Sequence, residues 1–194
     1  MRNSTQINQN INSDTVFFFD MDETLIETDF ANFLSYQEAI QSVMQSETEI
    51  KYVPNERFNR TTLSRIFPNL TEEKLVEIVK QKEINYINHL TQTKLNKTAY
   101  DILIRYSKTN KTVLVTNCRE DRAILTLEYH NLIDKFSHLL FKQTGDKYNR
   151  VNKYINALTI LSLSAENVIA FENDKIEIED AKLAGIHIDN IISL

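Results

Sequence analysis

An apolar run that ends abruptly in two carboxylates constrains this chain more than any other feature. Residues 16–19, Val-Phe-Phe-Phe, are all β-formers, and such an unbroken apolar run is typical of a strand buried on both faces in a parallel sheet. Asp20 and Asp22 follow it directly. Because ligands of open parallel sheets bind beyond the carboxyl ends of the strands, the run predicts both a sheet and the position of a site.

The two carboxylates, Asp20 and Asp22, stand two positions apart, so in extended backbone they project in the same direction. Two like charges at this separation repel each other unless a cation or a shared proton relieves them. Mg²⁺ is the natural cation, since it prefers carboxylate, carbonyl and water oxygens. An acidic turn that simply follows a core strand is the alternative interpretation of this pair alone.

Composition narrows the function classes. The 194 residues suffice for one sizeable domain, or for one domain with an insertion. A net charge of −5 gives no basic footprint for a nucleic-acid polymer. The single cysteine, Cys118, excludes an intramolecular disulfide and suits a reducing compartment. No apolar run has transmembrane length and the first residues lack a secretory pattern, so we expect a cytoplasmic protein without a membrane partner.

Residues 20–24, Asp-Met-Asp-Glu-Thr, resemble the first motif, Asp-x-Asp-x-Thr, of the haloacid dehalogenase-like hydrolase superfamily. Further motifs follow in the family's order, so the resemblance extends from about Thr15 to the last residue. It implies an α/β fold with a doubly wound, Rossmann-like parallel sheet. Runs of β-formers place the strands near residues 15–19, 112–116, 138–141, 167–171 and 188–192.

Two segments are expected around this core. Residues 1–14 are mostly polar and predict a disordered tail. Between residues 28 and 109 the apolar residues recur at helical spacing, with Thr71 as one N-cap. The resemblance makes this segment a helical cap over the active site, which would exclude water and select the substrate, inserted between core residues 15–27 and 110–194. The alternative is that these helices continue an ordinary α/β layer.

The second and third motifs follow the next two strands. Thr116 matches the hydroxyl residue that binds the transferring phosphoryl group, and Asn117 adds a donor for an anion. Cys118 lacks a His/Asp arrangement that would make it a nucleophile. For the lysine that neutralises the phosphoryl charge, Lys147 fits best, in the turn made by Gly145 and Asp146. Lys153, at the start of the next helix, is the competitor.

The fourth motif departs from the family pattern. Aligning residues 181–186, Ala-Lys-Leu-Ala-Gly-Ile, with the helix that follows this motif puts Glu172 on its Glu and Asn173 on its metal-binding Asp. An amide oxygen can ligate Mg²⁺ but brings no charge. On this interpretation Asn173→Asp should tighten Mg²⁺ binding. The alternative is an acidic run that only favours a helix N-terminus.

The resemblance implies a Mg²⁺-dependent phosphatase for a small phosphorylated metabolite. Asp20 would be the nucleophile and Asp22 the acid and base, with Lys147 as the neutralising cation. Substrate binding would fall to Thr24, Thr116 and Asn117, and Mg²⁺ binding to Asp20, Asp22, Glu172 and Asn173. A sugar phosphomutase, and a binding or regulatory protein that kept the fold but lost turnover, are the alternatives.

Overall fold

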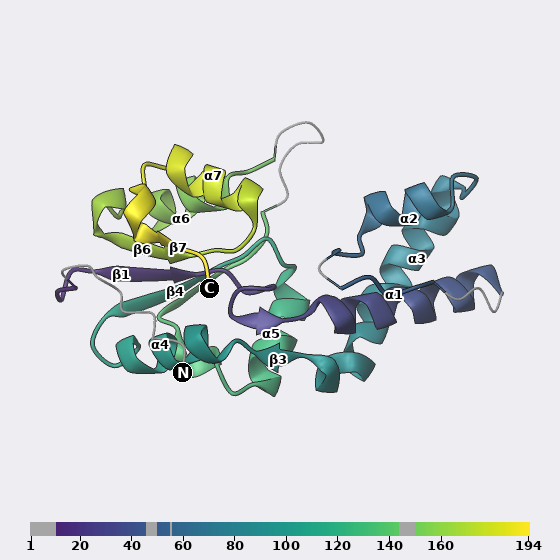
Figure 1. Ribbon diagram of the computed structural model, residues 1–194, viewed down its shortest axis with the longest axis horizontal. Coiled ribbons are helices and arrows are strands. Elements are labelled where there is room, and N and C mark those ends of the chain that lie inside the picture. The colour runs from purple at the N-terminus through teal and green to yellow at the C-terminus, as the bar shows by residue number, and fades with distance from the viewer. Residues whose placement is uncertain (1–10, 46–49, 55, 144–149) are drawn as a thin grey trace. The chain divides into compact units, whose positions relative to one another are not determined.

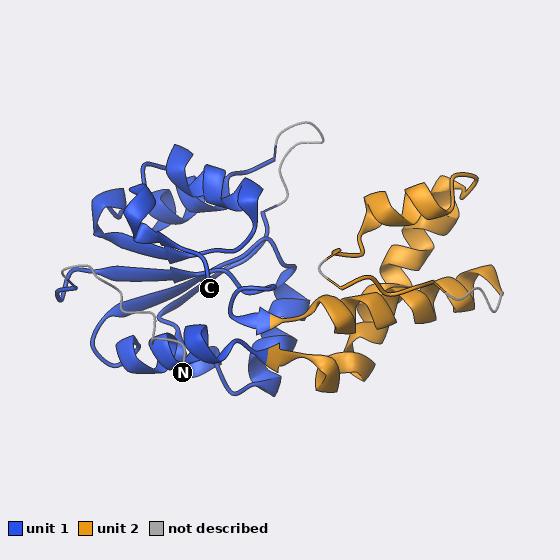
Figure 2. Ribbon diagram, in the orientation of Figure 1, with its two compact units in different colours: residues 1–26, 95–194 blue, residues 27–94 orange. Residues whose placement is uncertain are grey.

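The computed structural model describes residues 11–45, 50–54, 56–143 and 150–194 and divides the chain into two compact units (Figures 1 and 2). Unit 1 comprises residues 1–26 and 95–194, and unit 2 comprises residues 27–94. Two short strands, β2 (Ile26–Glu27) and β3 (Lys94–Leu95), pair with each other where the chain passes from one unit to the other. No helix among the described residues is long and apolar enough to cross a membrane.

Unit 1 is built on a five-stranded parallel sheet of order β5-β4-β1-β6-β7. The expected α/β fold is confirmed. The strands are β1 (Val16–Phe19), β4 (Lys111–Val115), β5 (His138–Leu140), β6 (Val168–Phe171) and β7 (Ile191–Ile192). The last strand is shorter than the expected 188–192, because Ile188–Asn190 forms a 3₁₀ turn, η4.

Helices cover both faces of this sheet (Figure 1). Phe17 and Phe19 of β1 pack in one apolar cluster with α4 (Lys97–Tyr106) and α5 (Glu120–Tyr129). Phe18 points to the other face, into a cluster with α6 (Lys153–Leu161) and α7 (Lys175–Leu183). Since successive strand residues face opposite sides, a strand between two helical layers must be apolar at every position.

Two expected boundaries differ from the structure. The expected cap ends at residue 109, but unit 2 ends at residue 94 and α4 belongs to unit 1. The reason is the apolar face of α4, whose buried residues Ala99, Ile102 and Leu103 join the cluster of Phe17 and Phe19. Of the expected disordered tail of residues 1–14, residues 1–10 lie outside the described residues, and Ile11 packs against the same cluster.

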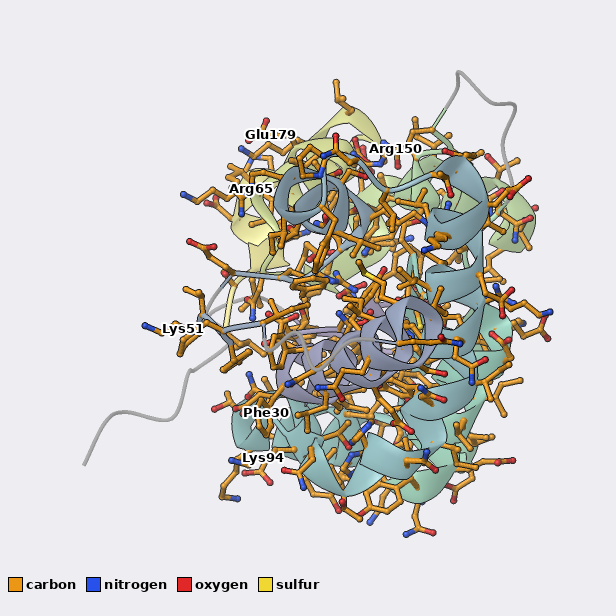
Figure 3. The ribbon with its side chains drawn as sticks, turned by 90° about the vertical axis from the view of Figure 1, so that its right-hand side faces the viewer. Phe30, Lys51, Arg65, Lys94, Arg150 and Glu179 are labelled. Carbon is orange, nitrogen blue, oxygen red and sulfur yellow. The ribbon has the colours of Figure 1, made fainter. Side chains whose placement is uncertain are left out.

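Unit 2 is helical, as its sequence pattern predicts. It contains α1 (Asp29–Met44), α2 (Arg60–Ile66), α3 (Glu72–Asn85) and the 3₁₀ helix η1 (Tyr86–Gln92). Its own core holds Tyr36, Ile40, Leu63 and Ile78. Thr71 caps α3 as expected, accepting a hydrogen bond from the Lys74 amide at 3.3 Å. Phe30, labelled in Figure 3, packs edge-on against Tyr52 in this unit.

The strand order places the topological switch at β1. From β1 the chain moves outward to β4 and β5, then crosses back to β6 and β7 on the other side. Phe19 is in register with Leu114 of β4 and with Phe171 of β6. The residues that follow these three strands therefore meet at the switch point, where ligands of doubly wound sheets bind.

Candidate active site

The loop after β1 holds the two carboxylates in a tight turn. Asp20 and Asp22 are 7% and 8% exposed, and Thr24 is fully buried. The carbonyl of Met21 accepts hydrogen bonds from the amides of Thr24, Leu25 and Ile26 at 3.0–3.3 Å. The turn closes through Glu23, whose φ of 60° is left-handed.

Lys153 brings a buried positive charge to the site. Its Nζ donates to Asp20 Oδ1 and to Glu172 Oε2, both at 2.7 Å. The N-cap Asn152 accepts from the amides of Tyr154 and Ile155, so α6 begins beside the carboxyl edge of the sheet. Lys153 is the first residue of that helix, and its ammonium joins the ends of β1 and β6.

Burial and charge act together on these groups. Burial raises the pKa of Asp20 to about 7, although the ammonium of Lys153 opposes the rise. Burial alone would lower the pKa of Lys153, but the carboxylates of Asp20 and Glu172 outweigh it and raise the value. Burial and the neighbouring Glu172 likewise raise the pKa of Tyr154. Lys153 is therefore charged and Tyr154 neutral at physiological pH.

Glu177 of α7 links Lys153 to the loop after β4. Its Oε1 accepts from Asn117 Nδ2 at 2.8 Å and from Arg150 Nη2 at 2.6 Å, and its Oε2 lies 3.5 Å from Lys153 Nζ. Arg150, labelled in Figure 3, also donates to Asp180. Asn117 is thus bound to Glu177 rather than presented alone to an anion.

Asp22 makes an ion pair that sequence reasoning missed. Arg122 of α5 donates Nη2 to Asp22 Oδ2 at 2.8 Å, and the two side chains are only 10% and 5% exposed. The same guanidinium donates Nε to Cys118 Sγ at 2.9 Å. An adjacent guanidinium favours the ionised form of a carboxyl group. Since 100 residues separate the partners, no local pattern indicates this contact.

Two hydroxyl residues named from the motifs are buried. Thr116 is 1% exposed and its Oγ1 accepts from the Cys118 amide at 3.1 Å. Thr24 Oγ1 accepts from the Asn173 amide at 3.2 Å. Thr24 therefore connects the first and fourth motifs, whereas Thr116 stands at the end of β4 beside β1. Lys147 lies outside the described residues, so its role stays a prediction.

The side chains of Glu172 and Asn173, in the fourth motif, accept hydrogen bonds from other protein groups. Glu172 Oε2 accepts from Lys153 and from the Tyr154 hydroxyl, and its Oε1 accepts from the Asp174 amide. Asn173 Oδ1 accepts from the Ser193 hydroxyl and the Leu194 amide, both at 2.8 Å. Every side-chain oxygen of these two residues thus accepts at least one hydrogen bond from the protein.

A Mg²⁺ site is only partly supported by these residues. Within the described ranges, no group of three or more His, Cys, Asp and Glu side chains is arranged to hold a metal ion. Asp20 and Asp22 supply hard oxygen atoms at the strand end, which suit Mg²⁺. Asn173 does not fit the ligand set that the motif resemblance implies, because its one side-chain oxygen is uncharged and already accepts two protein hydrogen bonds.

The fold and the site define an α/β protein with a carboxylate–lysine centre at its topological switch point. The chain belongs to the haloacid dehalogenase-like hydrolase family, whose model matches residues 17–190. Among curated proteins, none matches this chain.

Solved structures share the fold at low sequence identity. A haloacid dehalogenase-like family hydrolase from Streptococcus pneumoniae is 16% identical, with a TM-score of 0.72 over 90% of this chain and 83% of its own. CbbY from Rhodobacter sphaeroides, solved with phosphate, is 15% identical, with a TM-score of 0.72 over 92% and 84%. A "predicted phosphoglycolate phosphatase" from Haemophilus somnus is 16% identical, with a TM-score of 0.73 over 95% and 85%.

Proposed function

We propose that this protein hydrolyses a small phosphomonoester, with Asp20 as the nucleophile. The observation that carries the proposal is the buried contact between Asp20 and Lys153 at the switch point. Phosphoryl transfer needs an in-line nucleophile and neutralisation of charge on the phosphoryl oxygens. The Asp20 carboxylate supports the first requirement by offering a nucleophilic oxygen. The Lys153 ammonium, 2.7 Å away, supports the second by offering positive charge.

The first step transfers the phosphoryl group to the protein. A carboxylate oxygen of Asp20 attacks phosphorus, the ester P–O bond breaks, and the leaving oxygen takes a proton from Asp22. Lys153 remains protonated and neutralises the growing charge. The Thr116 hydroxyl accepts from the Cys118 amide, which leaves its hydrogen able to donate to a phosphoryl oxygen.

The second step releases phosphate. Water attacks the aspartyl-phosphate, Asp22 takes a proton from that water, and the bond between Asp20 and phosphorus breaks. The ion pair with Arg122 favours the carboxylate form of Asp22 that this step needs, whereas the first step requires Asp22 to enter protonated against that preference. Mg²⁺, which the family resemblance implies, would add positive charge for the phosphoryl oxygens, and we propose Asp20 and the backbone carbonyl of Asp22 as its ligands.

The fourth motif favours a second candidate, a binding or regulatory protein with little turnover. Its support is the engagement of Glu172 and Asn173 in protein hydrogen bonds. The two candidates differ in whether phosphate is released. The role of unit 2 as a substrate-selecting cap stays a prediction on either reading.

The test is a phosphate-release screen with phosphorylated sugars, nucleotides and small acids in the presence of Mg²⁺. We expect turnover of at least one monoester, abolished by Asp20→Asn and unchanged by Asp101→Asn, a surface carboxylate of α4 that pairs with Lys97. An Asp20→Asn variant that turns over at the parent rate would exclude Asp20 as the nucleophile. A parent that binds a phosphorylated ligand without releasing phosphate would favour the binding protein.

A further inference from the structure

Asn173 joins three separate segments through one side chain. Its Nδ2 donates to the Glu23 carbonyl at 2.7 Å and to the Leu194 backbone oxygen at 3.0 Å. Its Oδ1 accepts from the Ser193 hydroxyl and the Leu194 amide. Its backbone amide donates to Thr24 Oγ1. The end of β6 is thereby tied both to the turn after β1 and to residues 193–194.

The carbonyl that Asn173 binds belongs to the left-handed residue of the catalytic turn. Glu23 has a φ of 60°, and its amide donates to the Ile26 carbonyl at 2.8 Å. A left-handed conformation is unfavourable for a residue with a Cβ and persists only where its surroundings hold it. Asp22 lies directly before Glu23, so whatever holds Glu23 also fixes Asp22.

An amide can make these contacts and a carboxylate cannot. Both partners of Asn173 Nδ2 are backbone oxygen atoms, which require a donor. An ionised Asp at this position would place negative oxygen atoms against them. Asn173, which departs from the family motif, is therefore the residue type that can make these hydrogen bonds.

We propose that Asn173 is a positioning residue that clamps the Asp20–Thr24 turn, and that it is not a metal ligand. The clamp itself stands without any assumption about substrate, while its effect on turnover rests on the proposed hydrolysis. It also reverses the expectation from motif alignment, because Asn173→Asp breaks the clamp instead of completing a Mg²⁺ site.

The experiment compares four variants without any substrate. Asn173→Ala and Asn173→Asp remove the donation to Glu23. Ser193→Ala is the matched control, since it removes one hydrogen bond to the same side chain but leaves Nδ2 and Glu23 in place. Asn167→Asp, at an exposed site of unit 1, controls for the added negative charge. The readouts are thermal melting without metal, amide hydrogen exchange of residues 20–26, and calorimetric titration with Mg²⁺.

We expect Asn173→Ala to melt about 3–8 °C below the parent and Asn173→Asp lower still, from the usual worth of the two hydrogen bonds that Nδ2 donates. Exchange of residues 20–26 should quicken on the order of tenfold in both. The two controls should match the parent in exchange. Asn173→Asp should bind Mg²⁺ no more tightly than the parent.

Two results would overturn the clamp. One is Mg²⁺ binding that tightens tenfold or more in Asn173→Asp, which would identify position 173 as a metal ligand. The other is parent-like exchange of residues 20–26 in Asn173→Ala, which would show that Glu23 keeps its conformation without the amide. Neither result depends on turnover, so failure of the clamp and failure of the proposed hydrolysis are distinguishable.

Discussion

Replacing Lys153 with Met should remove the positive charge at the centre of the site while keeping most of the side-chain volume. Lys153 is 7% exposed and touches Asp20 and Glu172 at 2.7 Å. At an effective dielectric constant of 20, two unit charges at this distance attract by about 6 kcal/mol. Most of this is offset by the cost of burying the charges, and breaking a buried pair from one side usually costs about 3–5 kcal/mol. Asp20 can take a proton in response, so the lower end applies here.

The expected result is a melting temperature about 6–12 °C below the parent, at 2–4 °C per kcal/mol for a chain of this size. Turnover should fall roughly 10²-fold or more, because a pre-organised charge that stabilises the transition state is lost. Lys182→Met is the control, since Lys182 pairs with Glu179 on the surface of α7, with 37% and 65% of the side chains exposed. Such a pair contributes at most about 1 kcal/mol.

A direct comparison with Lys147→Met decides between the two lysines of the third motif. Thermal melting and steady-state turnover are measured on all three variants and the parent. Parent-like turnover in Lys153→Met, together with a large loss in Lys147→Met, would refute the assignment of Lys153 as the neutralising cation. Parent-like melting of Lys153→Met would refute the buried ion pairs.

Two further predictions concern stability. Because the pKa of Asp20 is about 7 in the folded protein against an ordinary 3.8, the folded state binds a proton that the unfolded state releases, so the free energy of unfolding falls as pH rises from about 4 to 7. The two pH units between pH 5 and the folded-state pKa correspond to about 3 kcal/mol. The free energy of unfolding from urea titrations should fall by about this much between pH 5 and pH 8 in the parent and by less in Asp20→Asn; equal falls would contradict the shifted pKa. Gly185 has a φ of +90°, and an added Cβ would make only ordinary contact with Ala165. Gly185→Ala should therefore lower the melting temperature by about 2–6 °C through backbone strain alone. An unchanged melting curve would show that the turn relaxes.

The elements that sequence predicts well are those with a strong local pattern. The apolar run 16–19 became the central strand because it is buried by helices on both faces. The α3 helix begins at the expected cap, Thr71. The α2 helix has a weak local pattern, because Leu63 is its single buried residue.

The expected end of the cap differs from the end of unit 2 for a related reason. An amphipathic helix shows in its sequence that one face is buried, but not against which layer. The pattern of residues 97–106 is therefore equally compatible with either unit, and only the packing of Ala99, Ile102 and Leu103 against β1 decides it. The contact between Arg122 and Asp22 also depends on tertiary packing alone. No residue near either partner in the sequence indicates that the two side chains meet.

Lys153, in contrast, has a local signal of its own in the sequence. Asn152 is a strong N-cap residue, and it places Lys153 at the first position of α6. In a doubly wound sheet the helix that runs back along a strand's face starts near the carboxyl edge of the sheet, where the site lies. A lysine at the first helical position therefore has the reach to contact a carboxylate that follows the central strand. The capping residue, combined with the fold class, ranks Lys153 above a lysine in the preceding turn, and the contact with Asp20 agrees with that ranking.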